Sequence, residues 1–68
     1  MIDTNTLKGL IAKKGLSQRT LANKLGITPK TFYSKMSKGK FNSDEMYAMI
    51  EILEINEPSK IFFANHVT

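Results

Sequence analysis

The sequence lacks cysteine, has a single histidine, and contains no apolar run near the ~18 residues that a membrane span needs. The lack of cysteine excludes disulfides and thiolate metal sites, and it is typical of a protein from a reducing compartment. The one histidine, His66, cannot assemble a metal cluster by itself. A secretory signal has a charged segment followed by an apolar one, and the first residues do not show this pattern. We therefore expect a cytoplasmic protein that uses no metal or other cofactor and does not enter a membrane.

Acidic residues are nearly absent from the first 40 positions, where Asp3 is accompanied by nine lysines and arginines. Residues 41–68 have the opposite balance, with five acidic residues against Lys60. The two parts carry formal charges of +8 and −4, which add up to the +4 of the chain. Scattered lysines can simply keep helices soluble, but a basic part and an acidic part in one small domain favour one side that faces a polyanion such as nucleic acid.

Apolar spacing and helix-capping residues predict one all-α domain over residues 1–68, with four or five short helices and no strand. A chain of 68 residues supports only one small core, so nearly every apolar residue is needed inside it. The expected helices, in chain order, cover about 4–14, 18–25, 28–37, a stretch that begins after Asn42 or Ser43, and a short helix or tail within 57–68 that begins at Pro58.

Capping residues and single glycines mark the ends of these helices. Asn42 and Glu45 have the spacing of a capping box. Pro29 suits the first position of a helix, where its missing N–H costs nothing. Gly15 and Gly26 can adopt the left-handed conformation that ends a helix. The expected N-caps are Asp3 or Thr4, Ser17, Thr28, and Asn42 or Ser43.

The expected core residues recur at helical spacing. In chain order they are Leu7, Leu10, Ile11, Leu21, Ala22, Leu25, Phe32, Met36, Met46, Met49, Ile50 and Leu53. The last helix is expected to carry Ile61 and Phe62, with Ala64 beside them. Three adjacent apolar residues cannot all face one core, so one of Ile61, Phe62 and Phe63 either stays exposed or packs against a second subunit.

The middle of the chain has the residue types that two closely crossing helices require. Ala22 is small enough for the point of closest approach, and Gly26, four residues later, can adopt the positive φ of the turn. Ile27 fills the angle between the helices, and Phe32 anchors the second helix on the core. This order predicts a helix-turn-helix over about residues 17–37.

This segment resembles the helix-turn-helix of small phage repressors and Cro proteins, within the xenobiotic-response-element family of regulators. The likeness covers roughly residues 7–53. The residues that carry it are Leu16, Ser17, Gln18, Leu21, Ala22, Leu25, Gly26, Ile27, Thr28, Thr31, Phe32 and Gly39. The resemblance implies a lambda-repressor-like domain that inserts the helix at 28–37 into the major groove of double-stranded DNA. It also implies a sequence-specific transcriptional regulator, either a phage-type repressor or a Cro-like switch protein.

Two positions and one loop length depart from the family pattern. Lys35 follows Phe32 by three residues, at a place where many members have an apolar residue, and Met36 is apolar instead. Pro29 stands where many members have a glutamine or serine that contacts a base. The connection to Gly39 is also one residue longer than usual. These departures affect the docking angle of the recognition helix rather than the fold.

The residues expected to contact DNA lie on and around the second helix of the pair. Because Phe32 and Met36 face inward, Lys30 faces outward, where it can bond guanine O6 and N7. Tyr33 and Ser34 can reach a base or a phosphate. The full set of expected DNA-contacting residues is Gln18, Arg19, Thr28, Pro29, Lys30, Thr31, Tyr33, Ser34, Lys38, Lys40, Asn42 and Ser43.

Phosphate contacts are expected to position the domain and to make binding depend on salt. The resemblance implies that Gln18 binds a phosphate and braces the recognition helix. Arg19, Lys38 and Lys40 are in reach of the DNA backbone. The free amides at the helix start behind Asn42 offer a further phosphate site.

One such domain reads only a few base pairs, so the resemblance implies a dimer on a pseudo-palindromic operator with half-sites about 34 Å apart. We expect a weak homodimer through the C-terminal segment. An alternative function is a small modulator that binds a partner repressor and has weak DNA affinity of its own, which Pro29 and the apolar tail favour. An enzyme is not expected, because the sequence shows no paired catalytic carboxylates, no nucleophile with a nearby histidine and no phosphate-cradling glycine loop.

Overall fold

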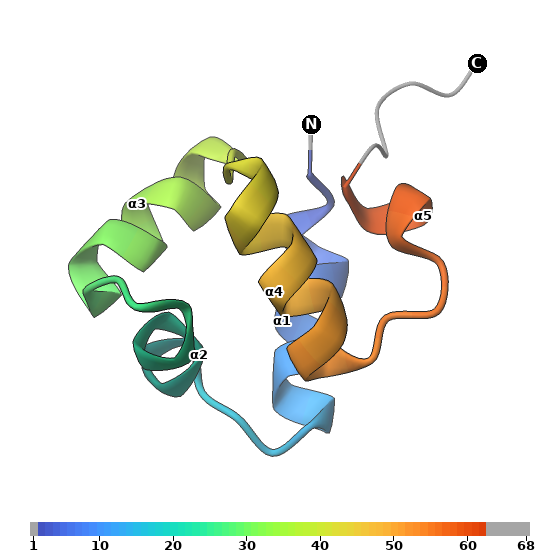
Figure 1. Cartoon of the computed structure of the whole chain (residues 1–68), viewed down its shortest axis with the longest axis horizontal. Helices are drawn as coiled ribbons and strands as arrows, with labels where there is room; N and C mark the ends of the chain where they lie inside the picture. Colours follow the sequence, from blue (N-terminus) through green and yellow to red (C-terminus); the bar gives the residue numbers. More distant parts are fainter. Residues whose placement is uncertain (1, 63–68) are drawn as a thin grey trace.

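Residues 2–62, which the computed structural model describes, form five helices and no strand. The helices are α1 (Thr4–Lys13), α2 (Gln18–Leu25), α3 (Pro29–Lys38), α4 (Ser43–Leu53) and α5 (Pro58–Phe62). The prediction of an all-α fold is therefore confirmed. In Figure 1, α2 and α3 lie at one end of the long axis and α5 at the other, with α1 and α4 between them. Within the same residues, none of the helices combines the length and the apolar character that crossing a membrane requires.

Four of the helices begin with a side-chain oxygen that accepts a hydrogen bond from the amide three residues later. The capping oxygens belong to Asp3, Ser17, Thr28 and Asn42, at 2.8–3.1 Å from the amide nitrogens. The predicted caps are confirmed. Where the sequence allowed two candidates for one cap, the structure has Asp3 rather than Thr4 and Asn42 rather than Ser43. α1 ends at Lys13, one residue earlier than expected, because Lys14 is its C-cap.

Glycines in the left-handed conformation end α2 and α3. Gly26 has a φ of 79° and Gly39 a φ of 69°, values that residues with a Cβ rarely adopt. The amide of Gly26 donates to the Asn23 carbonyl at 3.1 Å. The amide of Ile27 donates to the Ala22 carbonyl at the same distance, which closes the last turn of α2. The chain therefore passes from α2 to α3 in a short, defined turn.

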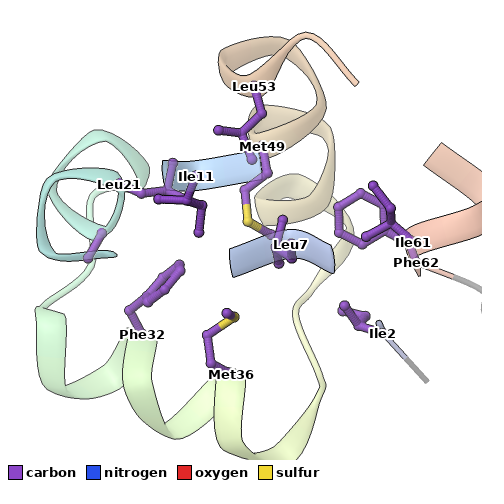
Figure 2. Close-up of a cluster of buried hydrophobic side chains, with 11 residues drawn as sticks. Ile2, Leu7, Ile11, Leu21, Phe32, Met36, Met49, Leu53, Ile61 and Phe62 are labelled. Carbon is purple, nitrogen blue, oxygen red and sulfur yellow. The ribbon is translucent and has the colours of Figure 1, made fainter. Parts of the chain in front are cut away.

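The core consists of buried apolar side chains from all five helices and the N-terminal segment (Figure 2). Its members are Ile2, Leu7, Ile11, Leu21, Ala22, Phe32, Met36, Met49, Leu53, Ile61 and Phe62. Four predicted members, Leu10, Leu25, Met46 and Ile50, are only partly buried and pack against its edge. Ile2 belongs to the core although it is absent from the predicted set.

The buried face of α4 is rotated from the predicted one. Spacing alone predicts a row of Met46, Ile50 and Leu53. The buried residues are Glu45, Leu53 and Met49, which the prediction placed beside this row. Met46 and Ile50 are only partly buried, so the prediction that they belong to the buried row is wrong. Glu45 turns inward because polar groups from α3 and from its own helix start bind its carboxylate, as described below.

The N-terminal segment ties the end of α3 to α5. The amide of Ile2 donates to the Gly39 carbonyl at 3.4 Å, and the amide of Asp3 donates to the Ile61 carbonyl at 2.7 Å. Two backbone bonds therefore connect helices that are far apart in the sequence.

The described part of the C-terminal segment packs into the core of its own chain. Ile61 is 5% exposed and Phe62 is 3% exposed. A dimer interface therefore cannot use these two side chains while the fold is intact. Phe63, Ala64 and His66, which the sequence predictions also mention, lie outside the described residues.

Candidate nucleic-acid interface

α2 and α3 are the most extensively packed pair of helices. Leu21 and Ala22 of α2 are fully buried, and so is Phe32 of α3. Ile27, in the turn, packs against the edge of the core. These burials and the left-handed Gly26 agree with the residue types expected at a short turn between two packed helices.

Three exposed residues of α3, namely Lys30, Ser34 and Lys38, follow one another at intervals of four. The helical period places this row opposite Phe32 and Met36, which are buried. No position from residue 4 to residue 43 is acidic. The outward face of α3 therefore presents hydroxyl and ammonium groups with no negative charge from either helix of the pair.

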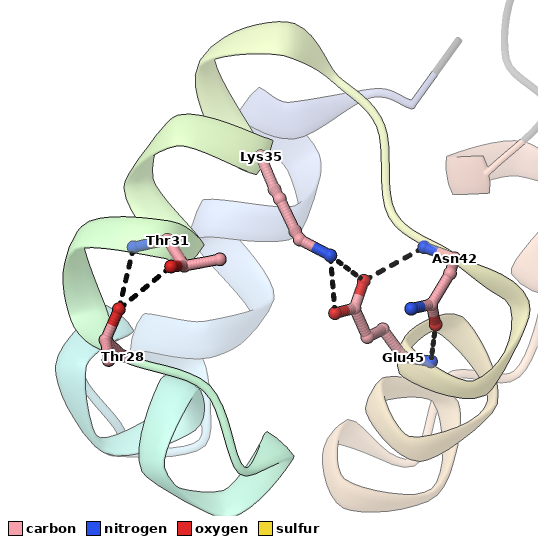
Figure 3. Close-up of polar contacts among 5 residues, drawn as sticks. All are labelled: Thr28, Thr31, Lys35, Asn42 and Glu45. Atoms are coloured by element: carbon pink, nitrogen blue, oxygen red, sulfur yellow. Dashed lines mark hydrogen bonds and ion pairs between the residues drawn. The ribbon is translucent and has the colours of Figure 1, made fainter.

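Tyr33 and Thr31 flank this row. Tyr33 is 48% exposed, and its ring meets Phe32 edge-on with the ring centroids 6.4 Å apart. The Thr28 hydroxyl donates to Thr31 Oγ1 at 2.9 Å, which leaves the Thr31 hydroxyl proton available for a ligand (Figure 3). Pro29 is half-buried at the first position of α3 and has no N–H to offer.

Cations occupy the first turns of α2 and α3, where the helix dipole favours anions. Arg19 and Lys30 are each the second residue of their helix, both are exposed, and neither first turn contains an acid. A charge near a helix end interacts with the helix dipole by about 0.3–1 kcal/mol, and for a cation at the N-terminal end this interaction is unfavourable. A bound anion would relieve this conflict by contacting the helix start and the cation together. These two helix starts therefore suit a polyanion.

The remaining predicted cations, Lys38 and Lys40, lie at the far end of α3 and just after it. Lys38 is its last residue, Lys40 follows the left-handed Gly39, and both lysines are exposed. The amide of Lys40 donates to the Lys35 carbonyl at 3.1 Å, which holds this connection against the helix. Gln18 is half-buried at the first position of α2. Positive charge is thus available at both ends of α3.

Asn42 and Ser43 lie at the start of α4, where the local chemistry differs from that of α2 and α3. Asn42 Oδ1 accepts from the Glu45 amide at 2.8 Å, and the Asn42 amide donates to Glu45 Oε1 at 2.9 Å. This first turn also holds Asp44, so two carboxylates already face the positive end of the helix. The Asn42 Nδ2 group and the Ser43 hydroxyl take no part in the capping box. They are therefore the groups of these two residues that could contact a phosphate.

An ion pair that the sequence reasoning did not predict joins α3 to α4 (Figure 3). Lys35 Nζ lies 2.6 Å from Glu45 Oε2 and 2.9 Å from Oε1. The Glu45 side chain is 8% exposed and that of Lys35 is 29% exposed. Two signals in the sequence pointed to it: a lysine at an otherwise apolar position, and the capping-box glutamate. Neither signal identified the partner, because the two residues lie on different helices.

Other surface features lie away from α3. A cavity of about 480 Å³ lies among α1, α5 and the connection between α4 and α5, and it mixes apolar residues with both signs of charge. None of the predicted DNA-contacting residues lines it. On α4, Tyr47 is 70% exposed, the most exposed large hydrophobic residue of the described chain. Within residues 2–62, no group of three histidine, cysteine or acidic side chains could hold a metal ion.

No protein-family model, no curated protein and no solved structure matches this chain. The resemblance to phage repressors therefore rests on the sequence pattern alone.

Proposed function

We propose that this protein is a sequence-specific regulator of transcription that binds double-stranded DNA. In this proposal α2 and α3 form the helix-turn-helix of a lambda-repressor-like domain, and α3 enters the major groove. The observation that carries the proposal is the outward row Lys30, Ser34 and Lys38 on a helix whose other face is anchored in the core. The row lies in a stretch of 40 residues, 4–43, that contains no acid.

Base readout would come from the outward row of α3. Lys30, near the start of the helix, can donate to guanine O6 and N7, which lie in the major groove. The hydroxyls of Thr31 and Ser34 can bond a base edge or a phosphate. Tyr33 can bond a phosphate or contact a thymine methyl with its exposed ring.

Most phosphate contacts would come from residues at the two ends of the helix pair, including Lys38 at the end of the row. Arg19 and Gln18 lie at the start of α2, and Lys38 and Lys40 lie at the other end of α3. Contacts of this kind fix the orientation of the domain on DNA and make affinity fall with salt. Such a regulator would work by occupying its site, as a repressor or a Cro-like switch protein in the cytoplasm.

A selection from random duplex DNA at fixed salt tests the proposal. The expected result is an enriched sequence of a few base pairs, read twice with the spacing of a pseudo-palindrome if two copies bind. The Lys30→Ala variant, selected in parallel, should lose preference at one base pair of each half-site. Enrichment of no sequence by the wild-type protein, together with no salt-dependent DNA binding, would contradict the proposal.

A second candidate function is that of a modulator that binds a partner repressor. The exposed ring of Tyr47 favours it, because it lies between Asp44 and Glu51 on the outward side of α4 and takes no part in the core. A gel shift separates the two functions. If the protein shifts DNA only when a partner repressor is present, and Tyr47→Ala abolishes that effect, the modulator function is favoured.

A further inference from the structure

We propose that Lys35 and Glu45 are positioning residues whose ion pair sets the orientation of α3 relative to α4, and thereby the accuracy with which α3 discriminates between DNA sequences. The inference rests on the proposed function. It concerns two residues that would not touch DNA themselves, and it adds a determinant of specificity behind the contact surface.

The contacts of Glu45 make it a junction between the two helices. Its carboxylate accepts from Lys35 Nζ through both oxygens, at 2.6 and 2.9 Å, and from the Asn42 amide at 2.9 Å. Its own amide donates to Asn42 Oδ1 at 2.8 Å. The Lys35 side chain of α3 and the backbone at the start of α4 are therefore both bonded to the buried carboxylate of Glu45 (Figure 3).

The backbones of α3 and α4 approach each other less closely than either approaches α2. Their apolar contribution is shared through the core, where Met36 of α3 and Met49 of α4 are both buried. Between α3 and the connection to α4, the rings of Phe32 and Phe41 pack in a tilted arrangement with centroids 5.4 Å apart, a contact that does not include α4 itself. Among the described residues, Lys35–Glu45 is the one salt bridge that joins α3 to another helix.

Stability alone does not account for an ion pair whose carboxylate is buried, since apolar residues of similar volume often stabilise a fold equally well. An ion pair with both carboxylate oxygens engaged differs from an apolar contact in its directional geometry. Lys30 and Ser34 are on the helix that this pair orients, while Lys40 and Ser43 lie on the connection and on α4. Loosening the pair would let the base-reading row and these phosphate-facing residues move relative to each other.

The test uses the double variant Lys35→Met/Glu45→Gln. It leaves the net charge unchanged, and the glutamine can still accept from the Asn42 amide. The matched control is Lys8→Met/Asp44→Asn, which makes the same charge changes at two exposed positions. A second comparison sets Glu45→Gln against its control Asp44→Asn, and each of these variants removes one negative charge. This comparison replaces the first one if the double variant does not fold. Lys35→Arg should retain wild-type behaviour, because a guanidinium can also bond both oxygens of the Glu45 carboxylate.

The first measurement needs no DNA. Because the chain has no cysteine, spin labels can be placed at the exposed positions Ser37 on α3 and Tyr47 on α4 by two cysteine substitutions. The distance distribution between the labels should broaden in Lys35→Met/Glu45→Gln and stay unchanged in the control. An unchanged distribution in the ion-pair variant overturns the inference, whatever the protein binds.

The second measurement is the affinity ratio between the selected site and a site changed at one base pair, at a temperature where circular dichroism shows every variant folded. The ratio should fall about tenfold in Lys35→Met/Glu45→Gln and stay constant in the control. A purely structural role would lower the melting temperature and leave the ratio unchanged, which would overturn the inference. Failure of the wild-type protein to bind DNA would instead contradict the proposed function, and the label distances would still report whether the pair orients α3.

Discussion

Lys35 of α3 and Glu45 of α4 form an ion pair in which Nζ lies 2.6 and 2.9 Å from the two carboxylate oxygens. The pair explains two residues that depart from the apolar spacing of their helices. It explains how α3 tolerates a lysine three residues after the fully buried Phe32. It also explains why a glutamate, rather than Met46, occupies the buried row at the start of α4. Lys35 is therefore not a cation that is available to DNA.

Lys30 and Lys40 should differ in what they contribute to DNA binding. Lys30→Ala should weaken binding to the selected site by about 1–3 kcal/mol and relax preference at one base pair, because its row faces the base edges. Lys40→Ala should weaken all sequences alike and reduce the salt slope by about 1. Fluorescence anisotropy over a range of salt, on selected and scrambled duplexes, measures both. Lys8→Ala, exposed on α1, is the control. Identical behaviour of the first two variants would contradict the assigned roles.

Alanine at Gly26 and at Gly9 should change stability in opposite directions. Nothing lies within 4 Å of a Cβ built at either position, so the backbone conformation alone decides. Gly26 has a φ of 79°, and alanine there should lower the free energy of unfolding by about 1–2 kcal/mol. Gly9 is inside α1, and alanine there should raise the free energy of unfolding by about 0.5–1 kcal/mol. Urea unfolding measures both, and changes of the same sign would be inconsistent with the described turn.

Glu54 adopts the left-handed conformation with a φ of 53°, the one non-glycine residue to do so in the described chain. Glu54→Gly should stabilise the fold by about 0.5–1 kcal/mol, because relief of the backbone strain outweighs the added freedom of the unfolded chain. Glu54→Gln keeps the strain and removes the charge that pairs with Lys14 at 3.1 Å. Both groups of that pair are well exposed, so this control should change stability by less than about 0.5 kcal/mol. Thermal unfolding would contradict the argument if the glutamine variant were the more stable of the two.

Asp3 should make stability depend on pH at the acidic end. The hydroxyl of Thr6 donates to its carboxylate at 2.7 Å and the amide of Thr6 at 3.1 Å, and these bonds lower the pKa of Asp3 from its ordinary value of 3.8. Because the pKa is lower in the folded state, ionised Asp3 stabilises the fold above the ordinary value. This contribution is lost as the pH falls through that value and then through the lower folded one.

The Thr6→Val variant tests this assignment, because it removes the larger cause of the lowered pKa and keeps a β-branched side chain. The difference in unfolding free energy between wild type and Thr6→Val should be largest near neutral pH and should shrink by about pH 2. Denaturant unfolding at several pH values measures it. A difference that does not vary with pH would show that the Thr6 hydroxyl acts only by packing.

Phe62 should behave as a core residue and not as an interface residue. It is 3% exposed in the single chain, so Phe62→Ala should lower the free energy of unfolding by about 3 kcal/mol. Tyr47→Ala, at a position 70% exposed, should have little effect and serves as the control. If Phe62→Ala altered the oligomeric state in sedimentation and left stability unchanged, α5 would have to be an interface element.

The amino-acid sequence by itself determined the helices, because the signals that define them are local. A cap such as Ser17 or Thr28 bonds an amide three residues away, and the left-handed turn at Gly26 needs only a missing Cβ. The apolar spacing likewise identified Phe32 and Met36 as the inward side of α3, and with them the outward row.

Only the tertiary structure decided the contacts between residues on different elements. Ile2 is buried because its segment bonds the end of α3 and α5, and Ile61 and Phe62 face the same core from the other end of the chain. Met46 and Glu45 are adjacent on α4, and the lysine of α3 decides which of them is buried. Helical periodicity gives the faces of a helix but contains no information about a partner on another helix, so these pairings emerge only when the helices pack.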